Sequence, residues 1–162
     1  LGQSAPLPTP LGRIDSLLRF RVAEAPTTLD WNRAHTSYET PFLVNLMEGL
    51  TEHDENLVPQ PRLAESWTIS EDGLIYRFSI RKNVLWSDGV PLVAQHFVDS
   101  WSRLRQPALK AAYADYLEDV ASAVAEGGHT LVVRLKRPVP YFLHLPTFWA
   151  TFPIRKDLIQ RD

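Results

Sequence analysis

The alternation of apolar and polar positions predicts a β-hairpin in the middle of the chain. The stretches "AESWTIS" and "LIYRFSIR" bracket the tripeptide EDG at 71–73, where a glycine readily takes the positive φ of a tight turn. Successive side chains of a strand point to opposite faces, so one face of the second arm is apolar. That face carries Leu74, Tyr76, Phe78 and Ile80. We predict that it lies in the core of a mixed α/β domain.

A helical period replaces this alternation on either side of the hairpin. Between residues 94 and 104, Phe97, Trp101 and Leu104 recur at the spacing of one helix face. The pattern also predicts helices over 38–50, 109–117 and 141–145. Alternating residues predict strands over 18–23, 120–124 and 130–135, and we expect "WATFPI" near the end to be extended.

The run "VLWSDGVPL" at 84–92 is the most distinctive stretch of the sequence. Its Ser87-Asp88-Gly89 segment predicts a turn before the helix at 94, because Asp side chains in turns accept backbone N–H groups. We expect Trp86 to anchor this turn in the core. Val93 precedes the helix and carries no capping oxygen, so the helix start should be weaker by about 1 kcal/mol than one with Thr there.

Composition narrows the class of protein. The 162 residues are 44% hydrophobic and 22% charged, which is the balance of one globular domain with a core. The formal net charge is −2 and the Lys and Arg residues are dispersed, so the sequence has no basic patch of the kind that binds nucleic acid. The absence of cysteine excludes disulfides and thiolate metal sites. The chain starts at Leu1 without a methionine, which we interpret as a processed or trimmed product, and the proline-rich residues 1–17 predict a flexible arm.

Candidate catalytic and metal-binding residues are few. The 5 histidines are isolated in sequence, and the acidic run Glu52-His53-Asp54-Glu55 is typical of a solvated loop rather than of a metal site. No nucleophile elbow or phosphate-binding glycine loop is present. Asp88 and Glu65 are carboxylates that a hydrolase could use, but Asp88 fits a turn equally well. We therefore nominate no catalytic residue, metal or cofactor.

Several ordered motifs resemble a known family. They are "TLD" at 28–30, "EGL" at 48–50, "PRLAESWTISEDGLIYRFSIRKNVLWSDGVPL" at 61–92, "FVDSW" at 97–101 and "PVPYFL" at 138–143. Together they resemble the family 5 extracytoplasmic solute-binding proteins, which are the oligopeptide- and dipeptide-binding proteins of ABC importers. The match runs from Leu18 to Ile154.

The resemblance implies the N-terminal part of a two-lobed fold of the periplasmic-binding-protein type. Its lobes would close over an extended peptide, without catalysis, metal or cofactor, and deliver it to a membrane permease. Residues 18–47 would begin the first lobe, 48–147 would form a small α/β subdomain, and 148–162 would return toward the first lobe. Family members are much longer, so the second lobe is expected to be absent and this fragment to bind peptides weakly.

The same resemblance implies the ligand-binding residues. His35, Thr36 and Ser37 match the loop after "TLDP" that lines the cleft, and Tyr113 matches a tyrosine that reaches toward the ligand. Two positions depart from the family pattern. Trp31 replaces the proline of "TLDP", and His35 stands where members that bind a peptide amino terminus often carry an acid.

Other interpretations of the resemblance stay open. The domain could be a sensory or interaction module with no transport role, and the ligand could be a dipeptide, an oligopeptide, a nickel chelate, a sugar or another small solute. We expect a monomer outside the cytoplasmic membrane, in the periplasm or lipid-anchored at the membrane, with no nucleic-acid partner.

Overall fold

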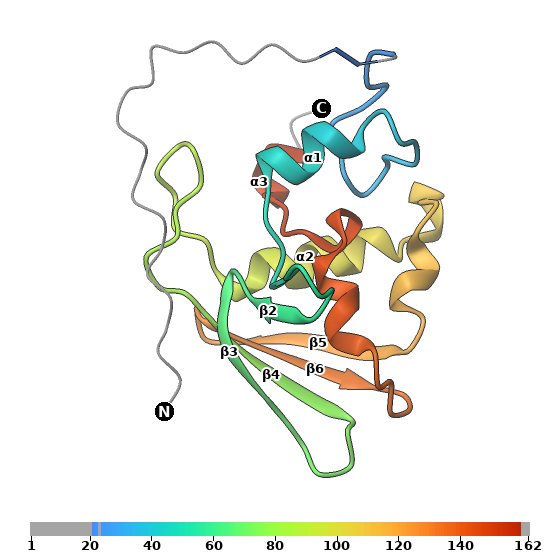
Figure 1. The fold of residues 1–162 in the computed structure, drawn as a ribbon. Coiled ribbons are helices and arrows are strands. Elements are labelled where there is room, and N and C mark those ends of the chain that lie inside the picture. The colour runs from blue at the N-terminus through green and yellow to red at the C-terminus, as the bar shows by residue number, and fades with distance from the viewer. Residues whose placement is uncertain (1–20, 23, 160–162) are drawn as a thin grey trace.

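The computed structural model describes residues 21–22 and 24–159 and has the predicted mixed α/β fold. In Figure 1 a sheet lies at one end of the molecule, α2 crosses above it, and α1 lies farthest from it. The strands are β1 (Thr51–His53), β2 (Pro59–Pro61), β3 (Ala64–Ile69), β4 (Ile75–Ile80), β5 (Val120–Glu126) and β6 (Thr130–Leu135). The α-helices are α1 (Thr40–Leu46), α2 (Ala94–Leu104) and α3 (Lys156–Ile159). The 3₁₀ helices are η1 (Pro107–Leu109), η2 (Ala114–Leu117), η3 (Phe142–Thr147) and η4 (Trp149–Thr151).

Two sequence predictions fall on residues that the structure does not describe. The arm expected over 1–17 lies entirely outside the described residues, and so does most of the strand expected over 18–23.

The hairpin predicted from alternation is the centre of an antiparallel sheet with the strand order β3-β4-β6-β5. Phe78 of β4 stands opposite Trp67 of β3 and Leu131 of β6. Tyr76, Phe78 and Ile80 are buried, as predicted for one face of this strand. Gly73 closes the hairpin with φ of 69°, so the turn uses the conformation that glycine permits without steric cost.

Helix α2 covers the buried face of this sheet and begins and ends at the predicted residues. Phe97, Trp101 and Leu104 form its buried stripe, with Ala94 and Ser100 on the same side. The Trp101 indole Nε1 donates a hydrogen bond of 2.8 Å to the Thr151 carbonyl oxygen, so the helix is also tied to η4. The apolar face of the sheet and the apolar face of α2 therefore pack together in one core.

The helix predicted over 38–50 is shorter than its pattern indicated. α1 ends at Leu46, and Met47 is extended, with φ of −138° and ψ of 164°. Gly49 explains why the chain straightens here, because a Cβ built on it would lie 2.1 Å from the Pro146 carbonyl oxygen. The backbone at 49 must pass close to η3, and the apolar residues after 46 serve β1 and the core rather than a helix face.

The helix predicted over 109–117 is wrong. Pro107–Leu109 and Ala114–Leu117 form separate 3₁₀ turns. Lys110 between them has φ of 51°, in the left-handed region, which a continuous right-handed helix does not contain. The apolar residues of this segment pack against the core from two short turns and not from one face of a helix.

The last part of the chain is more tightly coiled than predicted. η3 spans Phe142–Thr147, so a 3₁₀ helix replaces the short helix expected over 141–145. The "WATFPI" stretch is not extended throughout, since Trp149–Thr151 form η4 before Phe152 becomes extended. One core cluster runs from Ala34 to Phe152. The subdomain boundaries expected at residues 47 and 147 stay predictions.

Candidate functional site

The loop of His35, Thr36 and Ser37 is shaped by the carboxylate of Glu39. Oε2 accepts hydrogen bonds from the Thr36 N–H at 2.6 Å, the Thr36 hydroxyl at 2.7 Å and the His35 N–H at 3.2 Å. Oε1 accepts the Thr27 hydroxyl at 2.5 Å. The Glu39 side chain is fully buried, whereas His35 and Ser37 are exposed. A buried acid therefore holds an exposed polar loop in one shape.

Glu39 stays ionised in this position. Burial acts to raise the pKa of Glu39, but the donors from Thr27, Thr36 and His35 outweigh burial and lower it to about 2. A carboxylate that accepts several N–H and O–H donors needs no cationic partner to keep its charge. The predicted ligand loop thus rests on a permanent negative charge at neutral pH.

The segment before this loop is attached to the C-terminal end of α2. The Arg103 guanidinium donates to both carboxylate oxygens of Asp30, at 2.7 and 2.6 Å, and to the Asn32 side-chain oxygen at 3.0 Å. The buried Asn32 amide donates in turn to the Ser100 hydroxyl at 3.2 Å and to the Ala150 carbonyl at 3.0 Å. This bidentate pairing fixes residues 30–32 against α2 and η4.

Tyr113 lies in a cluster of aromatic rings. Its ring meets Phe148 edge-on at a centroid distance of 4.9 Å and Trp149 at 5.2 Å. Tyr116 stacks on Phe148 at 4.7 Å and stands at right angles to Tyr113. Trp149 is buried, Tyr113 and Phe148 are half-buried, and Tyr116 is exposed. The cluster therefore presents an aromatic surface at its outer side.

The structure brings the two predicted parts of the site to the same end of α2 but not into contact. The 30–37 loop is tied to Arg103, and the segment that holds Tyr113 follows α2 directly after Arg105. Figure 1 shows the loop, coloured blue, above the yellow-orange segment of residues 105–115 at one side of the molecule. In the part of the chain that the structure describes, no hydrogen bond or ring contact joins His35, Thr36 or Ser37 to Tyr113.

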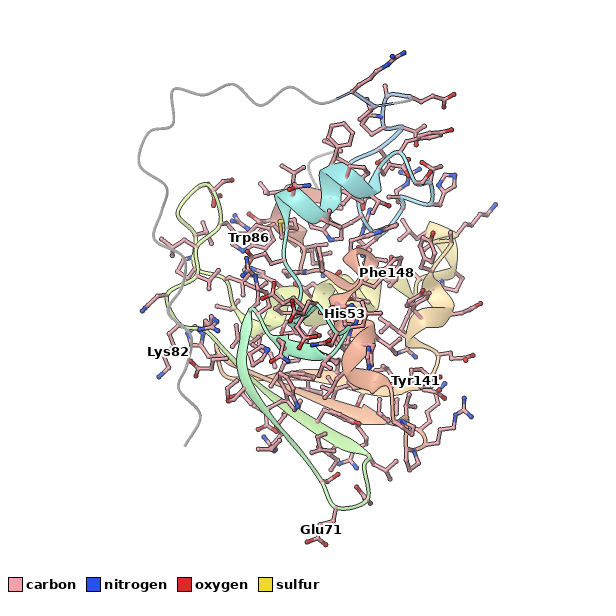
Figure 2. All side chains as sticks on the ribbon, viewed as in Figure 1. His53, Glu71, Lys82, Trp86, Tyr141 and Phe148 are labelled. Atoms are coloured by element: carbon pink, nitrogen blue, oxygen red, sulfur yellow. The ribbon has the colours of Figure 1, made fainter. Side chains whose placement is uncertain are left out.

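Sequence reasoning missed Glu39, Phe148 and Trp149. A signal for Glu39 was available, because Thr36 and Glu39 have the Thr-x-x-Glu spacing of a capping box just before a helix. Phe148 and Trp149 had no comparable signal, since their partner Tyr113 lies far away in the sequence. Figure 2 shows Phe148 just beyond η3, on the side of the yellow-orange segment.

The turn in "VLWSDGVPL" is a structural element. Asp88 accepts the Val90 N–H at 3.2 Å and pairs with the Arg155 guanidinium at 3.1 Å, and both interactions lower the pKa of Asp88. The Trp86 indole Nε1 donates to His96 Nδ1 at 3.2 Å, and the Arg155 guanidinium lies 5.9 Å from the Trp86 ring centre. Arg155 thus ties this turn to the segment before α3.

The start of α2 is capped by His96, although Val93 was expected to leave it without a cap. Val93 offers no side-chain hydrogen bond, as predicted, but its N–H donates to His96 Nδ1 at 3.2 Å. His96 therefore supplies the returning half of a capping box. Burial, followed by the charge of Arg155, lowers the pKa of His96 below its ordinary value, so the neutral ring that accepts these bonds is favoured.

A hollow of about 740 Å³ lies apart from the predicted ligand residues, between the end of α1, β1 and the 84–92 turn. Its charged lining includes Glu48, Glu52 and Arg62. Arg62 pairs with Glu48, and its Nε lies 3.5 Å from Glu52 Oε2. The guanidinium charge of Arg62 is thus already matched by two carboxylates.

The described residues show neither a cluster of metal ligands nor a membrane-spanning helix. Within residues 21–22 and 24–159, no group of three or more His, Asp or Glu side chains is arranged to hold a metal ion. Over the same part of the chain, no helix is long and apolar enough to cross a membrane. Glu65, the other carboxylate considered, is exposed on β3.

The sequence matches a known protein family over most of its length. The model described as bacterial extracellular solute-binding proteins, family 5 middle, matches residues 58–160, which is more than half of the chain. The periplasmic oligopeptide-binding protein OppA of Escherichia coli is 33% identical, and the alignment covers 99% of this chain and 32% of that protein.

Solved structures agree with this placement. The substrate-binding domain of an oligopeptide ABC transporter from Bacillus anthracis superposes with a TM-score of 0.83 and 31% identity, over 87% of this chain and 30% of that one. Haemophilus influenzae OppA in complex with the peptide RPPGFSPFR gives a TM-score of 0.80 and 30% identity, over 85% of this chain and 30% of that one. The predicted fold is therefore confirmed.

The chain spans about a third of the length of the relatives that it matches. The stretch that matches the family model nevertheless includes the four-stranded sheet, α2, Tyr113 and Phe148. The protein belongs to the bacterial extracellular solute-binding proteins of family 5.

Proposed function

We propose that this chain is part of the substrate-binding component of an ABC importer and contributes one wall of a peptide-binding cleft. The observation that carries the proposal is the pairing of a rigid polar loop, His35 to Ser37, with the aromatic surface around Tyr113 at one end of α2. Such a pairing suits an extended peptide, whose backbone needs polar partners and whose side chains need apolar surface.

The loop favours one kind of hydrogen bond to its ligand. The N–H groups of His35 and Thr36 both donate to Glu39. Within the described residues no hydrogen bond reaches the carbonyl oxygen of His35, so this acceptor is open to a ligand. It fits a donor on the ligand, such as a backbone N–H group or an amino terminus. The buried Glu39 charge behind the loop favours a cationic donor further.

Aromatic side chains supply the second part of the wall. Tyr116 and the half-buried Tyr113 and Phe148 offer ring faces that suit apolar or cationic ligand side chains. Because ring surfaces accept many side chains, this part would bind peptides with little sequence selectivity.

The transport role and location extend the same proposal. Relatives named as periplasmic oligopeptide-binding proteins support a position outside the cytoplasmic membrane, with delivery of the bound ligand to a membrane permease. A lipid anchor and a monomeric state are further parts of this proposal. A membrane fraction that retains the protein until a lipase or detergent releases it would support the anchor.

Titration of the protein that contains this chain with tri- to pentapeptides tests the proposal. We expect binding by calorimetry, and we expect Tyr113→Ala to weaken it about tenfold, because an aromatic anchor is worth about 1–3 kcal/mol. Tyr141→Ala is the matched control. Tyr141 is 55% exposed and stands at the other end of η3, away from Phe148 (Figure 2).

Equal peptide affinity for wild-type protein and Tyr113→Ala would remove the aromatic cluster from the site. Absence of binding to any peptide of the pool, with binding of a sugar or a metal chelate instead, would overturn the proposed ligand class.

A further inference from the structure

β1 and η3 approach one another along a row of alternating residues. Gly49 packs so closely on the Pro146 carbonyl oxygen that a Cβ has no room. Two residues later the buried Thr51 hydroxyl donates to the Leu143 carbonyl oxygen at 2.9 Å. Two residues further, His53 meets His144. Because strand side chains alternate, Thr51 and His53 point the same way, and the two histidines stand at the end of this row of contacts with η3.

The two imidazole nitrogens lie at a separation that a shared metal ion allows. His53 Nε2 lies 3.0 Å from His144 Nδ1, within hydrogen-bond distance, with ring centres 5.1 Å apart and ring planes inclined at 44°. Two nitrogens bound to one zinc ion at about 2.0–2.1 Å, with angles between 90° and 109°, lie about 2.8–3.4 Å apart. The observed separation falls in this range, so an ion could replace the hydrogen bond once both rings turn their nitrogens toward a common point.

We propose that His53 and His144 form a surface site for a late first-row divalent ion such as Zn²⁺, Ni²⁺ or Cu²⁺. Imidazole nitrogens select these ions over Mg²⁺ and Ca²⁺, which prefer oxygen ligands. Both side chains are exposed, so the ion can reach them from solvent. Figure 2 shows His53 beside the orange-red segment that contains η3.

A nearby carboxylate adds negative charge that favours a bound cation, but it is not placed to be a ligand. The Asp54 carboxylate is within range of His53, but it is already engaged by the Val58 and Asn56 N–H groups and by the Gln60 amide. Glu52 lies on the opposite face of β1 and pairs with Arg62. Within the described residues no third protein ligand completes the site, so water or a small chelating molecule would fill its remaining positions.

This site is separate from the proposed peptide wall. His53 lines the hollow beside Glu48 and Arg62, and neither histidine contacts Tyr113, Tyr116 or Phe148 in the described part of the chain. Metal binding and peptide binding therefore make independent tests, and failure of one leaves the other standing.

Calorimetric titration with ZnSO₄ at pH 7.5, with MgCl₂ as the comparison ion, tests the site. We expect one Zn²⁺ per chain and no heat from Mg²⁺. His53→Ala and His144→Ala should each weaken Zn²⁺ binding at least tenfold, because each removes one of two imidazole ligands. His35→Ala, which removes an exposed histidine of the peptide loop, should leave the affinity unchanged.

One further measurement keeps the outcome clear, since circular dichroism checks that each variant is folded. Wild-type affinity retained in His53→Ala or His144→Ala would overturn the proposal. Absence of Zn²⁺ binding to the wild-type chain would show that the pair is only a hydrogen bond between two rings, which would overturn it equally.

Discussion

The sheet with α2 and the margin around Glu39 and Arg103 are held together by different forces. In the sheet region the interior is apolar, built from rings and branched chains such as Phe78, Phe97 and Leu131. The buried polar side chains within the described residues lie outside the sheet itself, with Ser100 on α2 among them. They are Asn32, Glu39, Thr51, Ser100, Thr151 and Arg155, and none belongs to β3, β4, β5 or β6.

The difference explains where the candidate ligand groups are found. Apolar burial is strong but non-directional, so it stabilises a fold without fixing individual polar atoms. Hydrogen bonds to charged groups are directional, and leaving one partner unpaired is costly, so they hold a loop in one shape. We infer that apolar packing in the sheet region supplies most of the stability. The hydrogen bonds around Glu39 and Arg103 fix the shape of the candidate ligand loop.

The largest expected effect is on the apolar region. Phe78→Ala should lower the free energy of unfolding by about 4 kcal/mol, because it leaves a cavity in a fully buried position. Peptide affinity measured below the melting temperature should stay within about twofold, since the margin is untouched. Chemical denaturation and calorimetry measure the two quantities. Val124→Ala on the exposed side of β5 is the control, and a large loss of affinity in Phe78→Ala would break the proposed division between the regions.

Glu39→Ala should affect the stability less than Phe78→Ala and the peptide affinity more. It leaves the donors of Thr27, His35 and Thr36 without their acceptor, so we expect a loss of about 2 kcal/mol in stability. The loop would lose its fixed shape, so the peptide affinity should fall at least as much as in Tyr113→Ala. Glu65→Ala, which removes an exposed carboxylate on β3, is the matched control.

The pH dependence of Glu39 sharpens this test. Its pKa of about 2 lies below the ordinary value of 4.5, so its contribution is fully present above pH 4.5 and is lost as the pH falls through 2. Acid unfolding of the wild-type protein should therefore be steeper than that of Glu39→Ala below pH 4. Parallel acid titrations of both proteins would contradict the assignment of this buried charge.

The smallest effect concerns His96, at the start of α2 and far along the helix from Arg103. Its pKa is lowered in the folded protein, so the unfolded chain binds more protons just below pH 6.5 and the free energy of unfolding should rise with pH there. This contribution is fully present above 6.5 and is lost as the pH falls through the folded pKa. His96→Gln keeps an acceptor for the Val93 N–H without titrating, so it should flatten the profile between pH 5 and 7. An unchanged slope in His96→Gln would assign the pH dependence to another group.

The elements that the sequence predicted well are those whose side chains repeat. The hairpin and α2 follow periods of two and of about three and a half residues, and burial of Phe78 and Trp101 follows from them. The segment 109–117 has a similar pattern but contains Lys110 in the left-handed region, which no spacing of apolar residues reveals. α1 likewise ends early because Gly49 must pass Pro146, a contact between distant parts of the chain.

The candidate sites were predictable only in part. The family resemblance supplied the loop at His35 and the ring of Tyr113, and their ligand-binding role stays a prediction. The Arg103–Asp30 pair and the His53–His144 pair join residues 73 and 91 positions apart. Contacts of this kind depend on how elements pack, and polar partners carry no periodic pattern that would announce them.

The attachment of both candidate ligand segments to α2 has a mechanical consequence. Arg103 holds Asp30 through a bidentate ion pair, and Asn32 donates to the Ala150 carbonyl next to Trp149, on which Tyr113 packs. A shift of one segment against the other would therefore have to break these contacts. In the binding role proposed above, we therefore expect the loop and the aromatic rings to move as one unit and to keep their spacing when a ligand binds.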